Sequence, residues 1–97
     1  KGALSKFSGV NCNYNMALAQ LIDGNTSDAA SNLECARKNG DTYYLLAVVG
    51  ARTNNQTMML NNLEKAIRVD DKYKAEAKID REFIKYFNLT EFMELVK

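Results

Sequence analysis

The sequence predicts an all-α fold of five or six helices joined by short turns. Apolar residues recur at the three- and four-residue spacing that places side chains on one face of a helix. Gly, Asn and Asp residues separate these periodic stretches, and the chain contains no Pro. Because short connections place consecutive helices side by side, we expect antiparallel helical hairpins.

The first half of the chain predicts a lead-in segment and one helical hairpin. Residues 1–10 form the lead-in. The stretch 13–23 then carries an apolar stripe at helical spacing. We expect Gly24–Asn25 to end this helix, because both residues tolerate the left-handed conformation of a helix C-terminus. A second helix is predicted from there to Asn39–Gly40.

The second half predicts another hairpin and a charged C-terminal segment. A third helix, capped by Asp41 or Thr42, is apolar nearly all round in its first turns, which indicates burial between neighbours. Asn54–Asn55 form the next turn. The later elements are expected at residues 56–69 for the fourth helix, at 72–87 for a charged and exposed fifth helix, and after Thr90 for a short last helix.

Composition argues against an enzyme. The chain has no His, the commonest general base and metal ligand. The acidic pair Asp70–Asp71 is expected at a helix junction, and Glu76 and Asp80 on a solvated face among basic residues. The formal net charge of +1 offers no basic surface for nucleic acid, and no apolar stretch of about 18 residues could insert into a membrane. We therefore expect a non-enzymatic chain without a cofactor or metal.

The two Cys residues leave alternatives open. We favour small, partly buried free thiols. A disulfide is the alternative, because Cys12 begins the first predicted helix and Cys35 lies near the end of the second, so that antiparallel pairing could bring them together. A reactive role is disfavoured, since no His is available and only Arg37 and Lys38 lie near in sequence.

The two predicted hairpins repeat one another after a shift of 30 residues. Small residues in mid-helix let the partner helix approach closely, and larger apolar residues fill the space between. Because neither hairpin could bury its apolar face alone, we expect the two to stack. The shift places Tyr14 on Tyr44, Met16–Ala17 on Leu46–Ala47, Gly24–Asn25 on Asn54–Asn55, Leu33 on Leu63, and Ala36 on Ala66.

This pattern resembles tetratricopeptide repeats, which imply hairpins stacked as a short right-handed superhelix. Sel1-like repeats are a related alternative. The residues that carry the resemblance in the second unit are Tyr43, Leu46–Ala47, Asn54–Asn55, Leu63 and Ala66, and those that depart from the family's pattern are Asn13, Met59 and Asp71.

The resemblance implies a single domain over residues 1–97 with two degenerate repeats. Repeat 1 covers 11–40 and repeat 2 covers 41–71, while 72–97 resemble the C-terminal capping helices of bacterial arrays. Since the chain opens on Lys1 rather than Met, we expect a fragment of a longer bacterial protein. The cell envelope or periplasm is favoured over the cytoplasm, and the oligomeric state is left open.

The resemblance also implies protein binding. In such folds the first helix of each hairpin lines a concave groove, so we expect an interaction or scaffolding module with a protein or peptide partner. Tyr44 would offer contact area and Arg52 a positive charge for a carboxylate. Alternatively, the tyrosines pack in the core. A spacer or cap in a longer solenoid, and an accessory domain of an enzyme, are the other functions left open. The candidate partner-binding residues are Asn11, Tyr14, Leu18, Tyr44, Val48 and Arg52.

Overall fold

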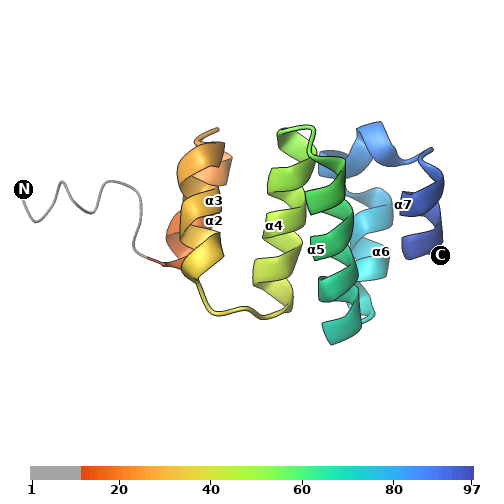
Figure 1. Cartoon of the computed structure of the whole chain (residues 1–97), viewed down its shortest axis with the longest axis horizontal. Helices are drawn as coiled ribbons and strands as arrows, with labels where there is room; N and C mark the ends of the chain where they lie inside the picture. The colour runs from red at the N-terminus through yellow and green to blue at the C-terminus, as the bar shows by residue number, and fades with distance from the viewer. Residues whose placement is uncertain (1–11) are drawn as a thin grey trace, which may run out of the picture. The chain divides into compact units, whose positions relative to one another are not determined.

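The chain is helical through the part that the structure, a computed structural model, describes (Figure 1). That part is residues 12–97, of which 77% are helical, and it contains no strand. The prediction of an all-α fold is therefore confirmed. The predicted lead-in, residues 1–10, and the candidate site residue Asn11 lie outside the described residues.

Two compact units divide the chain, Lys1–Lys38 and Asn39–Lys97. Among residues 12–97, no helix is both long enough and apolar enough to cross a membrane. The helices of the first unit are α2 (Tyr14–Ile22) and α3 (Thr26–Cys35), and those of the second are α4 (Gly40–Arg52), α5 (Gln56–Val69), α6 (Lys72–Ile79), the 3-10 helix η1 (Arg81–Tyr86) and α7 (Thr90–Leu95).

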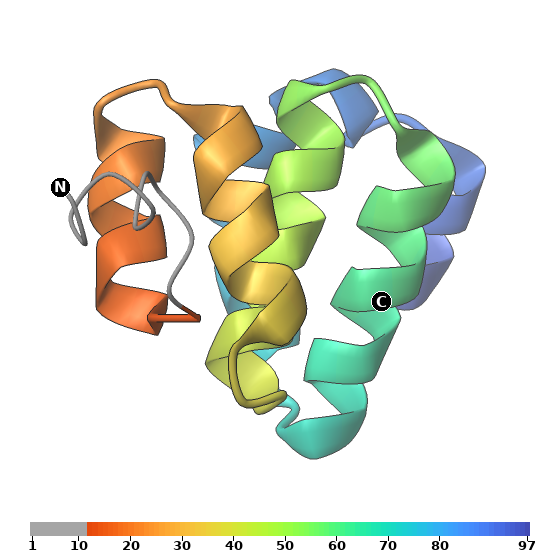
Figure 2. The ribbon, with the colours of Figure 1, turned by 60° about the vertical axis from the view of Figure 1, so that its left-hand side comes forward.

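The first unit is a hairpin in which α2 and α3 run antiparallel (Figure 2). Its core follows the predicted apolar spacing. Ala17 and Ala29 are fully buried, and Leu21 and Leu33 are 3% and 0% exposed. Asn32 is also fully buried, and its side-chain amide donates hydrogen bonds to the Gln20 side chain at 2.7 Å and to the Asp28 carbonyl at 3.2 Å. A buried polar group is tolerated here because it is hydrogen-bonded.

A disulfide joins Cys12 and Cys35, with the two Cα atoms 5.0 Å apart. The favoured interpretation of free thiols is therefore wrong, and the alternative is correct. The physical reason is the antiparallel hairpin. Cys12 lies just before the first turn of α2 and Cys35 is the last residue of α3, so the bond closes the open end of the hairpin. A hairpin with so small a core gains most from such a cross-link.

The second helix ends earlier than predicted. Helix α3 stops at Cys35, not at Asn39–Gly40. The side-chain amine of Lys38 donates hydrogen bonds to three backbone carbonyls at this end, which satisfies groups that the helix itself leaves unpaired. Asn39 instead caps the next helix, because its side chain accepts a hydrogen bond from the backbone N–H of Thr42 at 2.9 Å.

The turn between the two helices of each hairpin repeats after 30 residues. Helices α2 and α4 end at Ile22 and Arg52, and the next helices are capped by Asn25 and Asn55. The backbone N–H groups of these two Asn residues donate to the carbonyls five residues earlier, at 2.7 and 2.8 Å. The residues before them, Gly24 and Asn54, have φ of 85° and 60°. The predicted repeat thus holds in local backbone geometry.

Helices α4 and α5 form the hairpin of the second unit (Figure 1). The predicted packing residues Ala47, Leu63 and Ala66 are all fully buried. The two helices also approach closely at Gly50, where an added Cβ would lie 2.5 Å from the backbone nitrogen of Met59. A glycine is therefore required at this point of α4, because a side chain would meet backbone atoms of α5.

The prediction of one continuous fifth helix over residues 72–87 is wrong, because the structure has two shorter helices there. Asp80 separates them, with an extended backbone (ψ 120°) that ends α6 and begins η1. Its carboxylate accepts a hydrogen bond from the backbone N–H of Glu82 at 2.9 Å. The segment is also not simply exposed. Tyr73, Phe83 and Phe92 are 4%, 0% and 2% exposed, so aromatic residues of the C-terminal segment complete the core of the second unit.

Candidate functional site

Tyr44, the central residue of the predicted peptide site, lies in the core of the second unit. It is 8% exposed, and its hydroxyl donates a hydrogen bond to the Asp80 carboxylate at 2.7 Å. Its ring centroid lies 5.4 Å from that of Tyr73 and 5.7 Å from that of Phe83. Burial, reinforced by the bond to Asp80, raises the pKa of Tyr44 above its ordinary value. The alternative that Tyr44 is a core residue is therefore correct.

Arg52 is engaged by the C-terminal segment. Its Nε and Nη2 atoms donate to the two carboxylate oxygens of Glu82 at 2.9 and 2.6 Å. These hydrogen bonds lower the pKa of Glu82 and raise that of Arg52. A carboxylate of the chain itself thus occupies the position that the sequence assigned to a carboxylate of the partner.

The other predicted site residues lie on two helices. Val48 is 4% exposed on α4. Tyr14 and Leu18 lie on α2, where Leu18 is 38% exposed. The predicted stacking of Tyr14 on Tyr44 joins residues of different units, and it stays a prediction.

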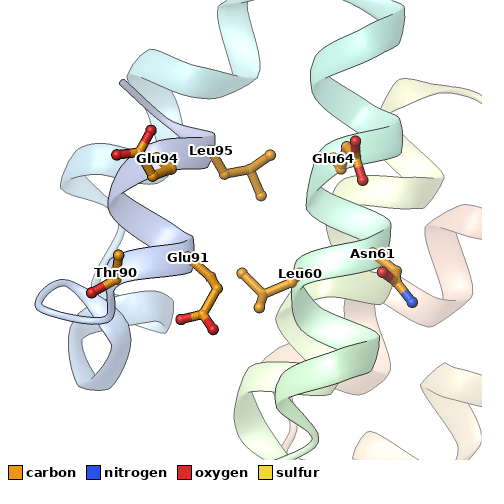
Figure 3. Close-up of a pocket in the computed structure, with 7 residues that line it drawn as sticks. All are labelled: Leu60, Asn61, Glu64, Thr90, Glu91, Glu94 and Leu95. Carbon is orange, nitrogen blue, oxygen red and sulfur yellow. The ribbon is translucent and has the colours of Figure 1, made fainter.

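A groove lies between α5 and α7 of the second unit (Figure 3). Its volume is about 710 Å³. Leu60 of α5 and Leu95 of α7 project into it, and both side chains are partly exposed. The lining residues are Leu60, Asn61 and Glu64 from α5, and Thr90, Glu91, Glu94 and Leu95 from α7.

The charges that line this groove are all negative. Glu64, Glu91 and Glu94 contribute carboxylates, and the lining contains no Lys or Arg. Two of them make ion pairs at the surface. Glu64 pairs with Arg68 at 2.9 Å, and Glu94 with Lys97 at 3.8 Å; both basic side chains are 76% exposed. Pairs so open to solvent are weak, at about 0.2–1 kcal/mol.

Sequence reasoning missed this groove, because Leu60 and Leu95 fit the pattern of core residues. A signal was nevertheless present. Each Leu lies four residues from a Glu on the same helix, Leu60 before Glu64 and Leu95 after Glu91. Residues four apart share a helix face. A helix face that carries both Leu and Glu is expected at the edge of the core, partly exposed to solvent. Which second helix lies opposite that face depends on the tertiary structure.

Helix α2 exposes a second apolar surface. Met16, Leu18 and Ile22 are 38%, 38% and 76% exposed, and no residue of this helix is charged. The residues of the second repeat equivalent to Met16 and Leu18 behave differently, since Leu46 and Val48 are 2% and 4% exposed. The first helix of the first hairpin therefore exposes two positions, Met16 and Leu18, that are buried in the second repeat.

Comparisons of the chain with protein-family models, with curated proteins and with solved structures found no match. Within residues 12–97, no group of three or more His, Cys, Asp or Glu side chains is arranged to hold a metal ion.

Proposed function

We propose that this chain is a non-enzymatic protein-interaction module of tetratricopeptide type, which binds a protein or peptide partner in the α5–α7 groove. The observation that carries the proposal is the pair Leu60 and Leu95, which face a groove of about 710 Å³ while still partly open to water. Burial of such apolar surface contributes about 25 cal/mol per Å². Concave sites with an apolar floor and a few polar groups are typical of binding sites.

The face of α4 is a poorer candidate than the groove. A partner at Tyr44 would have to displace the hydrogen bond to Asp80 and the rings packed against it. A partner at Arg52 would have to replace both hydrogen bonds to Glu82. Leaving the hydroxyl of the buried Tyr44 unpaired would cost about 1–3 kcal/mol. The groove requires no such displacement of core contacts.

Repetition supports the tetratricopeptide assignment. The two hairpins share helix ends, capping residues and turn hydrogen bonds after a 30-residue shift, at Gly24–Asn25 and Asn54–Asn55. Modules built from such hairpins present rigid helical surfaces, which suits a scaffold that holds a partner without reacting with it.

The proposal is tested by selecting binders from a random peptide library on the purified chain and measuring their affinity by calorimetry. We expect Leu95→Ser to weaken a selected peptide by about tenfold, because the lost apolar contact is worth roughly 1.5–3 kcal/mol when fully buried. Met93→Ser is the matched control, since Met93 lies on the same helix, is 46% exposed and does not line the groove.

Two results would count against a binding site in this groove. One is a library that yields no peptide above background. The other is an equal loss of affinity in the Leu95 and Met93 variants, because such peptides would bind elsewhere on the chain.

The open face of α2 favours a second candidate, a spacer within a longer solenoid. Terminal repeats of such arrays present a polar outer face, whereas α2 is uncharged and exposes Leu18 and Ile22. Fusing a second copy of residues 12–38 ahead of the chain should raise its melting temperature if another hairpin stacks there. The same fusion on Leu18→Ser is the control, and an equal rise in both would remove α2 from the stacking surface.

A further inference from the structure

We infer that the partner of the α5–α7 groove is a short amphipathic helix whose apolar stripe is flanked by Lys or Arg. This inference rests on the proposed function, and it adds the chemistry of the partner. The occupant must match both the apolar floor, Leu60 and Leu95, and the carboxylates around it.

The charge of the groove determines the charge of its partner. Every titratable residue that lines the groove is a Glu, at positions 64, 91 and 94 (Figure 3). An acidic segment placed there would meet three like charges, whereas a basic one would be attracted at long range and held at close range. The groove thus selects a cationic segment and repels anionic ones, including phosphate backbones and anionic lipid surfaces.

The existing ion pairs do not block a cationic partner. Arg68 and Lys97 hold Glu64 and Glu94 from outside the groove lining, and both basic side chains are 76% exposed. These surface ion pairs are solvated and screened, so breaking one of them to admit a partner's cation costs little free energy. On the groove side the incoming cation would be shielded from water by the apolar contact at Leu60 and Leu95, which strengthens the new pair.

Helical geometry decides the form of the partner. Both walls of the groove are helices, Gln56–Val69 and Thr90–Leu95, so neither wall offers a strand edge for an extended peptide. What the walls do offer is a furrow between two rows of side chains, the surface into which a third helix packs its own ridge. Apolar residues three and four apart on the partner would reach Leu60 and Leu95, and basic residues beside them would reach the carboxylates.

The test uses two synthetic helical peptides of about four turns. They share the same Leu stripe, but one carries Lys on its flanks and the other Glu. Fluorescence anisotropy measures binding of each to the whole chain. We expect the Lys peptide to bind at least about tenfold more tightly, and its affinity to fall as salt is added.

Charge reversal supplies the decisive variant. Glu91→Lys combined with Glu94→Lys should weaken the Lys peptide by about tenfold and strengthen the Glu peptide, while circular dichroism confirms that the helices persist. Glu76→Lys is the matched control, because Glu76 is an exposed Glu on α6 outside the groove. It should leave both affinities unchanged within about twofold.

The outcomes separate this inference from the proposed function. If both peptides bind equally, without salt dependence, but Leu95→Ser still abolishes binding, then the groove is a binding site and the basic partner is wrong. If the Lys peptide binds but Glu76→Lys weakens it as much as the double reversal, then the attraction is non-specific and the inference also fails. If neither peptide binds and the random library yields no groove-dependent peptide, then the proposed function fails as well.

Discussion

Gly50→Ala tests the close approach of α4 and α5 at Gly50. The added Cβ would lie 2.5 Å from the Met59 backbone nitrogen and 2.8 Å from its Cα, whereas ordinary contact begins at 3.4 Å. Helices α4 and α5 would therefore have to separate by about 0.9 Å, the difference between 3.4 and 2.5 Å. Because the atoms met are backbone atoms, no side-chain rotation relieves the clash.

The magnitude follows from two opposing effects. Ala favours a helix over Gly by about 1 kcal/mol. Overpacking of a well-filled core costs about 1–3 kcal/mol, and a backbone clash belongs at the upper end of that range. Separation also loosens the contacts of the fully buried Ala47, Leu63 and Ala66. We expect a net destabilisation of about 2 kcal/mol, which lowers the melting temperature by roughly 8–16 °C for a domain of this size.

Urea denaturation followed by circular dichroism measures this change. The matched control is the reverse substitution at an exposed helical position, Ala75→Gly on α6. Helix propensity predicts a loss of about 1 kcal/mol there. If Gly50→Ala stabilises the chain, as propensity alone requires, then the close approach of the two helices does not exist as described.

Three further predictions concern the disulfide and the titrating groups. Replacing Cys12 and Cys35 by Ser should lower the free energy of unfolding by about 3 kcal/mol for a sequence separation of 23, and adding a reductant to the wild type should have the same effect in urea denaturation. The pKa of Glu82 is lowered in the folded chain, so its pair with Arg52 stabilises the fold above about pH 4.5, and this stabilisation is lost as the pH falls below that value. In Arg52→Ala, the part of the acid-induced loss of unfolding free energy that comes from this pair, about 0.5 kcal/mol, should be absent. The pKa of Tyr44 is raised, so its contribution to stability is retained up to pH 10 and falls at higher pH. Tyr44→Phe should reduce this alkaline loss of stability, while lowering the free energy of unfolding by about 1 kcal/mol at neutral pH. Equal alkaline denaturation of the variant and the wild type would contradict this role of Tyr44.

Local patterns predicted the helical part of the fold well. The apolar stripe of residues 13–23 became α2, and the turn pairs Gly24–Asn25 and Asn54–Asn55 became the positive-φ turns of the two hairpins. These features are local because a helix pairs each backbone group with one four residues away and a turn involves adjacent residues. The prediction failed where the same residue could either continue a helix or cap a new one. Asp80 within a helical stretch capped a new element because its carboxylate accepts the N–H of Glu82.

The candidate site was predictable only in part. Tyr44 and Arg52 carry side chains suited to recognition, yet their partners, Asp80 and Glu82, lie 36 and 30 residues further along the chain. No local pattern encodes such pairings. A tyrosine on an apolar helix face is compatible with a binding surface or with a core, and its surroundings decide between them.

By itself, the sequence determined the helical character of the chain, the turns at Gly24–Asn25 and Asn54–Asn55 and the 30-residue repeat, because periodicity and capping act over a few residues. Tertiary structure alone decided that Cys12 forms a disulfide with Cys35 and that Leu60 and Leu95 line one groove. It also decided that Tyr44 and Arg52 form hydrogen bonds with side chains of the C-terminal segment. Each of these depends on how helices distant in sequence fold back on one another. The free energy of that packing is a sum over many weak contacts, which no short stretch of sequence contains.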